Sequence, residues 1–328
     1  MSFEAASPRR AASTGAFSRI ASAYGQELII LDAIVLLFAV VGTIAPRFTS
    51  QTNLTSIFVG NAYIAVAAIG MSMVIISGHI DVSVGSLIGV LATISGTLAV
   101  AGYPVWIAWL VPIVVGMAIT SIIGVLVAYV RIPSIVVTLG MLSILKGGLI
   151  SATGGAWITN LPPDYLIAQF RLLGVPSPVW FMAILTIAAA IWMRSTAFGR
   201  SIYAVGGNPE AARVAGIRVE ATTVSIFAIH GMFAGIAAVL FATQLQVIQS
   251  TVPPNLELTI ITASVVGGVS ILGGTGTVIG STLAAILFAA IGSSLIFLNV
   301  SAYWLRSVQG LLILATVLAD MARRHRIS

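Results

Sequence analysis

The chain has 328 residues, of which 59% are hydrophobic and only 7% are charged, against about 25% charged residues in an ordinary soluble domain. So few charges cannot cover the surface of a soluble protein of this length, and the composition therefore predicts a polytopic membrane protein. The sequence contains no cysteine, which excludes disulfides, thiolate metal sites and cysteine nucleophiles, and the formal net charge of +6 bears first on membrane orientation.

Ten apolar runs follow a polar, arginine-bearing segment at residues 1–26. A membrane-crossing helix needs about 20 such residues, so two of the runs, Val179–Met193 and Leu258–Leu272, are short. The other eight are Leu28–Ala45, Ile57–Ile76, Val82–Val100, Val105–Val130, Ile135–Ala152, Ala221–Ala242, Val278–Leu298 and Ser301–Leu318. The pattern predicts an all-α polytopic membrane protein with about ten transmembrane helices, between residues 27 and 320.

The arginines orient these helices. With the N-terminus inside, the inside segments carry Arg9, Arg10, Arg19, Arg131, Arg194, Arg200, Arg213, Arg218, Arg323, Arg324 and Arg326, and the outside segments carry Arg47, Arg171 and Arg306. Cytoplasmic segments of membrane proteins are enriched in Lys and Arg. Both termini are therefore predicted to be cytoplasmic, as tails at residues 1–26 and 321–328, and residues 194–220 form the largest cytoplasmic loop.

This loop contains the pattern of a short helix. Asn208 is a favourable N-cap, Pro209 suits the first helical position, and the negative charge of Glu210 favours the helix N-terminus. Gly216 can adopt the left-handed conformation that ends a helix. Two turns are unstable alone in water, so the helix must pack on a surface. That surface is either the membrane face of the same chain or a partner protein.

The second apolar run is followed by an interrupted segment, SGHIDVSVGSLIG, at residues 77–89. A carboxylate such as Asp81 is costly at membrane depth unless it is paired or hydrated, and irregular backbone is tolerated there only inside protein or beside a water-filled cavity. One interpretation is a tight cytoplasmic turn that Asp81 caps. The other is a discontinuous helix beside a transport path.

Two strings resemble a known family. The string GGNPEAARVAGIRV is similar to the coupling loop that contacts the ATPase in ABC-importer permeases of the ribose/simple-sugar type, within the branched-chain amino acid/ribose permease superfamily. The matching residues are Gly206, Gly207, Asn208, Glu210, Ala211, Ala212, Gly216 and Ile217, and the coupling residues that they imply also include Pro209. The resemblance implies that this short helix is the mechanical link to a cytosolic ATPase.

The string GHIDVSVGS resembles the GGIDLSVGS signature of the sugar-type permeases, and His79 stands where a glycine is common. Residues 267–280 and the last apolar run also resemble this family. The resemblance implies an inner-membrane permease subunit that imports a monosaccharide or a similar small polar solute by alternating access. Since Lys146 is the sole lysine and lies outside any Gly-Lys-Ser/Thr string, the chain has no P-loop, and ATP hydrolysis is expected on a separate subunit.

Candidate residues for the solute path are polar side chains in or next to the apolar runs. They are Asn61, His79, Asp81, Ser83, Ser86, Lys146 and Asn299. The single His230 in the middle of its run is predicted to form an interhelical hydrogen bond. We expect no catalytic, cofactor or metal site in this chain.

The expected partners are an ABC ATPase, a second permease copy or homologue, and a soluble solute-binding protein. The polar outside loops at residues 153–178 and 243–257 either dock that binding protein or are plain connectors. Residues 74–86 and 269–281 share five of thirteen letters, which is either an internal repeat or chance similarity. Two rivals remain: an amino-acid-type permease of the same superfamily, and an ion-coupled secondary transporter with Asp81 in the path.

Overall fold

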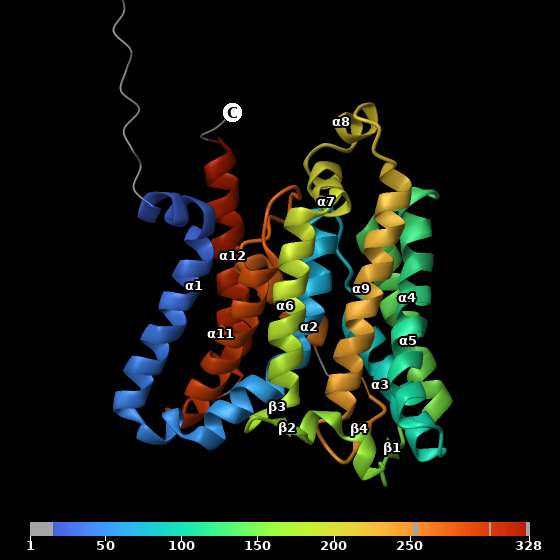
Figure 1. Cartoon of the computed structure of the whole chain (residues 1–328), viewed down its shortest axis with the longest axis vertical. Coiled ribbons are helices and arrows are strands. Elements are labelled where there is room, and N and C mark those ends of the chain that lie inside the picture. Colours follow the sequence, from blue (N-terminus) through green and yellow to red (C-terminus); the bar gives the residue numbers. More distant parts are fainter. Residues whose placement is uncertain (1–15, 252–254, 302, 326–328) are drawn as a thin grey trace, which may run out of the picture.

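The computed structural model describes residues 16–251, 255–301 and 303–325 and consists of a bundle of helices (Figure 1). The first half of the chain forms α1 (Ala16–Ile44), α2 (Gln51–Ile76), α3 (Val84–Val100), α4 (Val105–Ala128), α5 (Ser134–Thr153) and α6 (Ser177–Ser195). The second half forms α7 (Ala197–Gly207), α8 (Pro209–Val214), α9 (Val219–Ala242), α10 (Leu256–Val266), α11 (Val278–Phe297) and α12 (Trp304–His325).

Each of the ten predicted apolar runs coincides with a helix in the described part of the chain. Eight helices there are long and apolar enough to cross a membrane, namely α1, α2, α4, α5, α6, α9, α11 and α12. The other two, α3 and α10, are shorter, with 17 and 11 residues. The chain is thus a polytopic helical membrane protein. The predicted number of about ten full crossings is not confirmed, because glycine-rich segments interrupt the chain before α3 and after α10.

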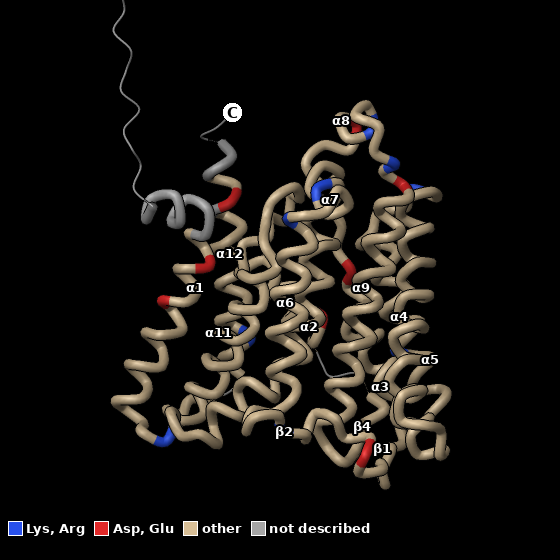
Figure 2. Tube along the Cα trace, viewed as in Figure 1, with Lys and Arg blue, Asp and Glu red and all other residues tan. Residues whose placement is uncertain are grey.

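The predicted N-terminal tail is partly helical, since α1 begins at Ala16 rather than near residue 27. Residues 1–15 and 326–328 of the two predicted tails lie outside the described residues. The start of α1 and the end of α12 lie at the same end of the bundle as α7 and α8 (Figure 1). We call this the α8 end. Charged residues gather there, and few lie along the middle of the bundle (Figure 2).

Helix α2 is the centre of the core. From Ile64 to Ile76 every residue of this helix is buried. It packs against α6, α9, α10 and α11. Such a helix, hydrophobic all round, is buried by protein rather than by lipid.

The backbones of α4 and α9 approach closely, because glycines stand where they cross. A Cβ at Gly116 of α4 would lie 2.5 Å from the carbonyl oxygen of Gly231 in α9 and 2.9 Å from Leu91. In lipid, where no hydrophobic force drives helices together, such small-residue contacts supply the packing energy. Helices α4 and α9 therefore form one tightly packed pair.

Gly116→Ala is expected to destabilise the bundle by about 1–3 kcal/mol, the usual cost of overpacking. The matched control is Gly140→Ala in α5, where an added Cβ meets no atom within 4 Å and the helix gains up to about 1 kcal/mol. Thermal unfolding of the detergent-solubilised chain measures both. Equal unfolding midpoints for the two variants would contradict the close α4–α9 contact.

The end of the bundle opposite α8 is closed by the two predicted outside loops, which meet each other. Strand β1 (Trp157–Ile158) pairs antiparallel with β4 (Ile248–Gln249), and β2 (Arg171–Leu172) forms a hairpin with β3 (Val175–Pro176). The 3-10 turns η1 (Pro46–Thr49), η2 (Pro163–Tyr165) and η3 (Ile167–Gln169) lie in the connections at this end. The buried Tyr165 donates a hydrogen bond to Ser95 of α3, which ties one loop to the bundle.

Candidate functional site

The predicted short helix in the large loop is present as α8. The Asn208 side chain accepts a hydrogen bond from the Ala211 amide at 3.0 Å, Pro209 begins the helix, and Gly216 follows its end with φ 83°. These features confirm the predicted capping pattern. Helix α8 projects from the end of the bundle, beyond α7 (Figure 1).

The two faces of α8 differ. Ala212 is only 3% exposed and packs on the chain itself, whereas Val214 is 90% exposed. An exposed valine at the tip of a projecting helix is apolar surface that a partner can cover. The coupling residues predicted from sequence include Ala211 and Ala212 but not Val214. Val214 could have been found because it is an aliphatic residue in a loop that faces water.

Ion pairs hold α8 on the start of α9. Arg213 contacts Glu210 at 3.2 Å and also hydrogen-bonds Glu220 in the first turn of α9. The hydrogen bond and charge of Glu220 raise the pKa of Arg213. Because these groups are exposed, the pairs orient α8 more than they stabilise it.

Three chain segments cross next to this loop with almost no space between their backbones. A Cβ at Gly206, near the end of α7, would overlap the carbonyl oxygen of Ile76 at the end of α2. The same Ile76 oxygen accepts a hydrogen bond of 2.8 Å from the amide of Gly274, whose φ is +78°. We call Gly206, Ile76 and Gly274 the glycine junction. It joins α7 to the break after α2 and to the break after α10. These breaks lie within the two similar segments at residues 74–86 and 269–281.

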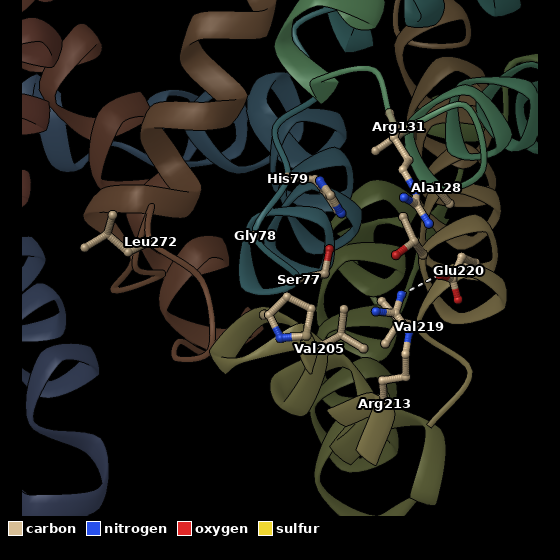
Figure 3. A pocket seen from close by; sticks show the side chains of 14 residues that line it. Ser77, Gly78, His79, Ala128, Arg131, Val205, Arg213, Val219, Glu220 and Leu272 are labelled. Atoms are coloured by element: carbon tan, nitrogen blue, oxygen red, sulfur yellow. Dashed lines mark hydrogen bonds and ion pairs between the residues drawn. The ribbon is translucent and has the colours of Figure 1, made fainter. Parts of the chain in front are cut away.

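A cavity of about 480 Å³ lies beneath α8, beside the glycine junction. Ser77 and His79 of the break line one side of it, and Arg131, Arg213 and Glu220 line the other (Figure 3). The break after α2 therefore borders a polar cavity at the α8 end. Of the predicted path residues, His79 lines this cavity.

Asp81 lies deeper, fully buried. Its Oδ1 accepts hydrogen bonds from the amide and the hydroxyl of Ser83 just before α3, and its Oδ2 lies 3.3 Å from Nε2 of His230 in the middle of α9. The segment is thus not a simple surface turn, because the carboxylate is paired inside the protein. The interhelical hydrogen bond predicted for His230 is not found among the described residues; its Nε2 instead lies near Asp81, in the break between α2 and α3.

The remaining predicted path residues are not brought together. Ser83 and Ser86 are buried at the start of α3, and Lys146 is exposed on α5. Asn299 is exposed after α11 with φ 56°. Asn61 of α2 lines a second cavity, of about 410 Å³, which Asn255, Thr259, Tyr303 and Gln309 also border.

The carboxylate of Glu257 was not predicted from sequence as part of the site. A Cβ at Gly85, in the first turn of α3, would lie 2.9 Å from the Glu257 amide and would overlap its carboxylate. Helix α3 runs from this point toward β1 and β4, and α10 runs the other way to pack on the first turn of α11. Glu257 therefore lies inside the bundle, where two short helices begin, although the sequence places it in a polar loop. Discontinuous helices of this kind line solute sites in transporters.

No group of three or more His, Asp or Glu side chains that could hold a metal ion occurs in the described ranges. The arrangement encloses Asp81 and His230 within the bundle. Its features are breaks in central helices, polar cavities near them and a capped projecting helix. They are typical of a membrane transport protein, with an exposed short helix at one end.

Comparisons with known proteins agree with this class. Residues 53–317 match the family described as "Branched-chain amino acid transport system / permease component", and the chain belongs to this family. The chain is therefore a multi-pass inner-membrane permease component rather than an enzyme.

Relatives include permease proteins of the autoinducer 2 import system. The chain is 38% identical to the LsrC protein of Yersinia enterocolitica over 90% of this chain and 82% of that protein. It is 37% identical to LsrC of Salmonella typhi, over 90% and 85% of the two chains, and 37% identical to LsrC of Escherichia coli, over 90% and 86%. No solved structure matches the chain.

Proposed function

We propose that the chain is the membrane-spanning subunit of an ATP-driven importer that carries a monosaccharide or a similar small polar solute into the cell. The observation that carries the proposal is the link between α8 and the interior of the bundle. Helix α8 is capped, pinned to α9 and connected through α7 to the glycine junction at both breaks. A displacement of α8 is therefore passed on to helices that border the polar cavities.

The proposed coupling residues are Gly206, Gly207, Asn208, Pro209, Glu210, Ala211, Ala212 and Gly216. In this mechanism α8 is the contact of a separate cytosolic ATPase, so the α8 end is the cytoplasmic side. ATP-driven closure of the ATPase pushes on α8, and α7 and α9 shift against the breaks. The cavity lined by His79 and the cavity lined by Asn61 then open alternately. An importer must never be open to both sides of the membrane at once.

The solute class follows from the relatives and the cavity linings. The relatives' names state import of autoinducer 2, and the family resemblance of residues 79–86 is to sugar-type permeases. The second cavity offers amide and hydroxyl groups from Asn61, Asn255, Thr259, Tyr303 and Gln309, and Arg306 also lines it. Amide, hydroxyl and guanidinium groups can all hydrogen-bond a polyhydroxyl solute.

Further partners of the proposed complex are a second permease copy or homologue and a solute-binding protein on the outside. The joined loops at β1–β4 and the β2–β3 hairpin give that binding protein a surface at the end opposite α8.

The experiment is purification of the chain from native membranes in mild detergent, followed by reconstitution. Support is a stoichiometric soluble ATPase that accompanies the chain, together with ATP-dependent uptake of labelled autoinducer 2 or of one member of a panel of labelled pentoses and hexoses. Uptake that survives ATP depletion and collapses with the ion gradient would refute the proposal in favour of an ion-coupled transporter. Uptake of labelled amino acids alone would refute the solute class.

A further inference from the structure

The buried pair of Asp81 and His230 joins the break after α2 to α9. Both side chains are fully buried. His230 Nδ1 and Nε2 and Asp81 Oδ2 have no hydrogen-bond partner among the described residues. The 3.3 Å contact between Nε2 and Oδ2 therefore links the two side chains. Buried ionisable groups in a membrane protein are costly and usually functional.

The pair is held from two sides. Asp81 is oriented by Ser83, whose amide and hydroxyl both bond its Oδ1. The ring of His230 is backed by α2, since a Cβ at Gly70 would lie only 2.9 Å from Nδ1. Neither side chain can therefore swing away without moving the backbone that carries it.

The same helix that carries His230 also begins at the coupling loop. Glu220, in the first turn of α9, is bonded to Arg213 of α8. His230 lies ten residues further along α9, about 15 Å at 1.5 Å per residue. Close packing at Gly116 stiffens α9 against α4. A push on α8 reaches His230 through one continuous helix.

We infer that the Asp81–His230 pair is the contact by which α9 moves the break at residues 77–83 during the transport cycle. The inference rests on the proposed function and deepens it. Asp81 and His230 are positioning residues in this scheme: they touch neither the ATPase nor, from their burial, a cavity. Loss of the pair leaves ATP hydrolysis in place but disconnects it from the opening of the cavities.

The test compares His230→Gln with His230→Asn in the reconstituted complex of full chain, ATPase and binding protein. Glutamine carries a donor nitrogen as many bonds from Cβ as Nε2 of histidine, whereas asparagine is one bond shorter and cannot reach Asp81. The readout is the ratio of solute accumulated to ATP hydrolysed, using the labelled solute that the wild-type complex accumulates. We expect about a tenfold or larger fall in this ratio for His230→Asn, the size expected when a buried polar group loses its partner. His230→Gln should keep most of the wild-type ratio.

Asp81→Ala, which removes the carboxylate altogether, should lower the ratio as His230→Asn does. The double variant should be no worse than either single one, because both remove the same contact. The control is Thr243→Val at the other end of α9, a buried hydroxyl that bonds only its own helix in the described structure. It should leave the ratio unchanged.

Two outcomes would overturn the inference. One is a wild-type ratio in His230→Asn. The other is a loss of uptake that is matched by an equal loss of ATP hydrolysis or of assembled complex, so that the ratio in the remaining complex is unchanged. That result would show that the pair has a structural role alone. A wild-type complex that lacks ATP-driven uptake would instead count against the proposed function itself.

Discussion

Gly206→Ala is expected to abolish solute uptake, because among the described glycines this position has the closest overlap with an added Cβ. The added Cβ overlaps the carbonyl oxygen of Ile76 and lies 2.8 Å from the amide of Gly274. These are backbone atoms joined by a hydrogen bond, so no side-chain rotation can relieve the overlap. The cost is at least the 1–3 kcal/mol that is usual for overpacking, equivalent to roughly a 5- to 150-fold change in a coupled equilibrium.

The chain supplies a matched control in another helix. Gly148 lies in α5, where an added Cβ meets no atom within 4 Å. Gly148→Ala should therefore import solute at close to the wild-type rate. Uptake by reconstituted vesicles and the yield of assembled complex measure both variants. If Gly206→Ala and Gly148→Ala behaved alike in both measurements, the glycine junction could not be a tight contact between α7 and the breaks.

Val214→Glu is expected to separate the chain from its ATPase and thereby to stop uptake. Val214 is 90% exposed at the tip of α8, so the substitution costs the isolated chain almost nothing. In the complex it places a charge in a contact that excludes water. The loss of a central interface residue costs about 2 kcal/mol or more, which corresponds to about 30-fold weaker association.

Leu173→Glu is the control for this prediction. Leu173 is 86% exposed, like Val214, but lies in the turn between β2 and β3 at the opposite end of the bundle. Co-purification of the ATPase with each variant, measured by quantitative mass spectrometry, gives the comparison. Retention of the ATPase by Val214→Glu at the wild-type level would show that α8 is not the coupling contact.

Several features of the fold were predictable from sequence because their causes are local. The length and hydrophobicity of the apolar runs predict helices. Lipid offers the backbone no hydrogen-bond partners, so a spanning segment must pair its own N–H and C=O groups. Helix α8 was equally predictable, since Asn208, Pro209 and Gly216 cap a helix through groups only a few residues away. The class of protein and its family followed from the same strings, and the comparisons confirm both.

The arrangement around the breaks required the tertiary structure. Asp81 and His230 are 149 positions apart in the sequence, and nothing near either residue indicates the other. Gly206 was predicted only as part of the string that resembles the coupling loop, but the close approach of Ile76 is what requires a glycine there. Glu257 read as part of a polar loop, because its depth depends on where α3 and α10 begin.

The physical reason for this division lies in the range of the interactions. Hydropathy and capping act within one turn or one span, so residue types and their spacing determine the elements and the family. Which polar groups share a buried site depends on how helices far apart in the sequence cross. In this protein the crossings at Gly116 and Gly206 are set by steric contact between backbones, and the side chains of the apolar runs carry little information about such contacts.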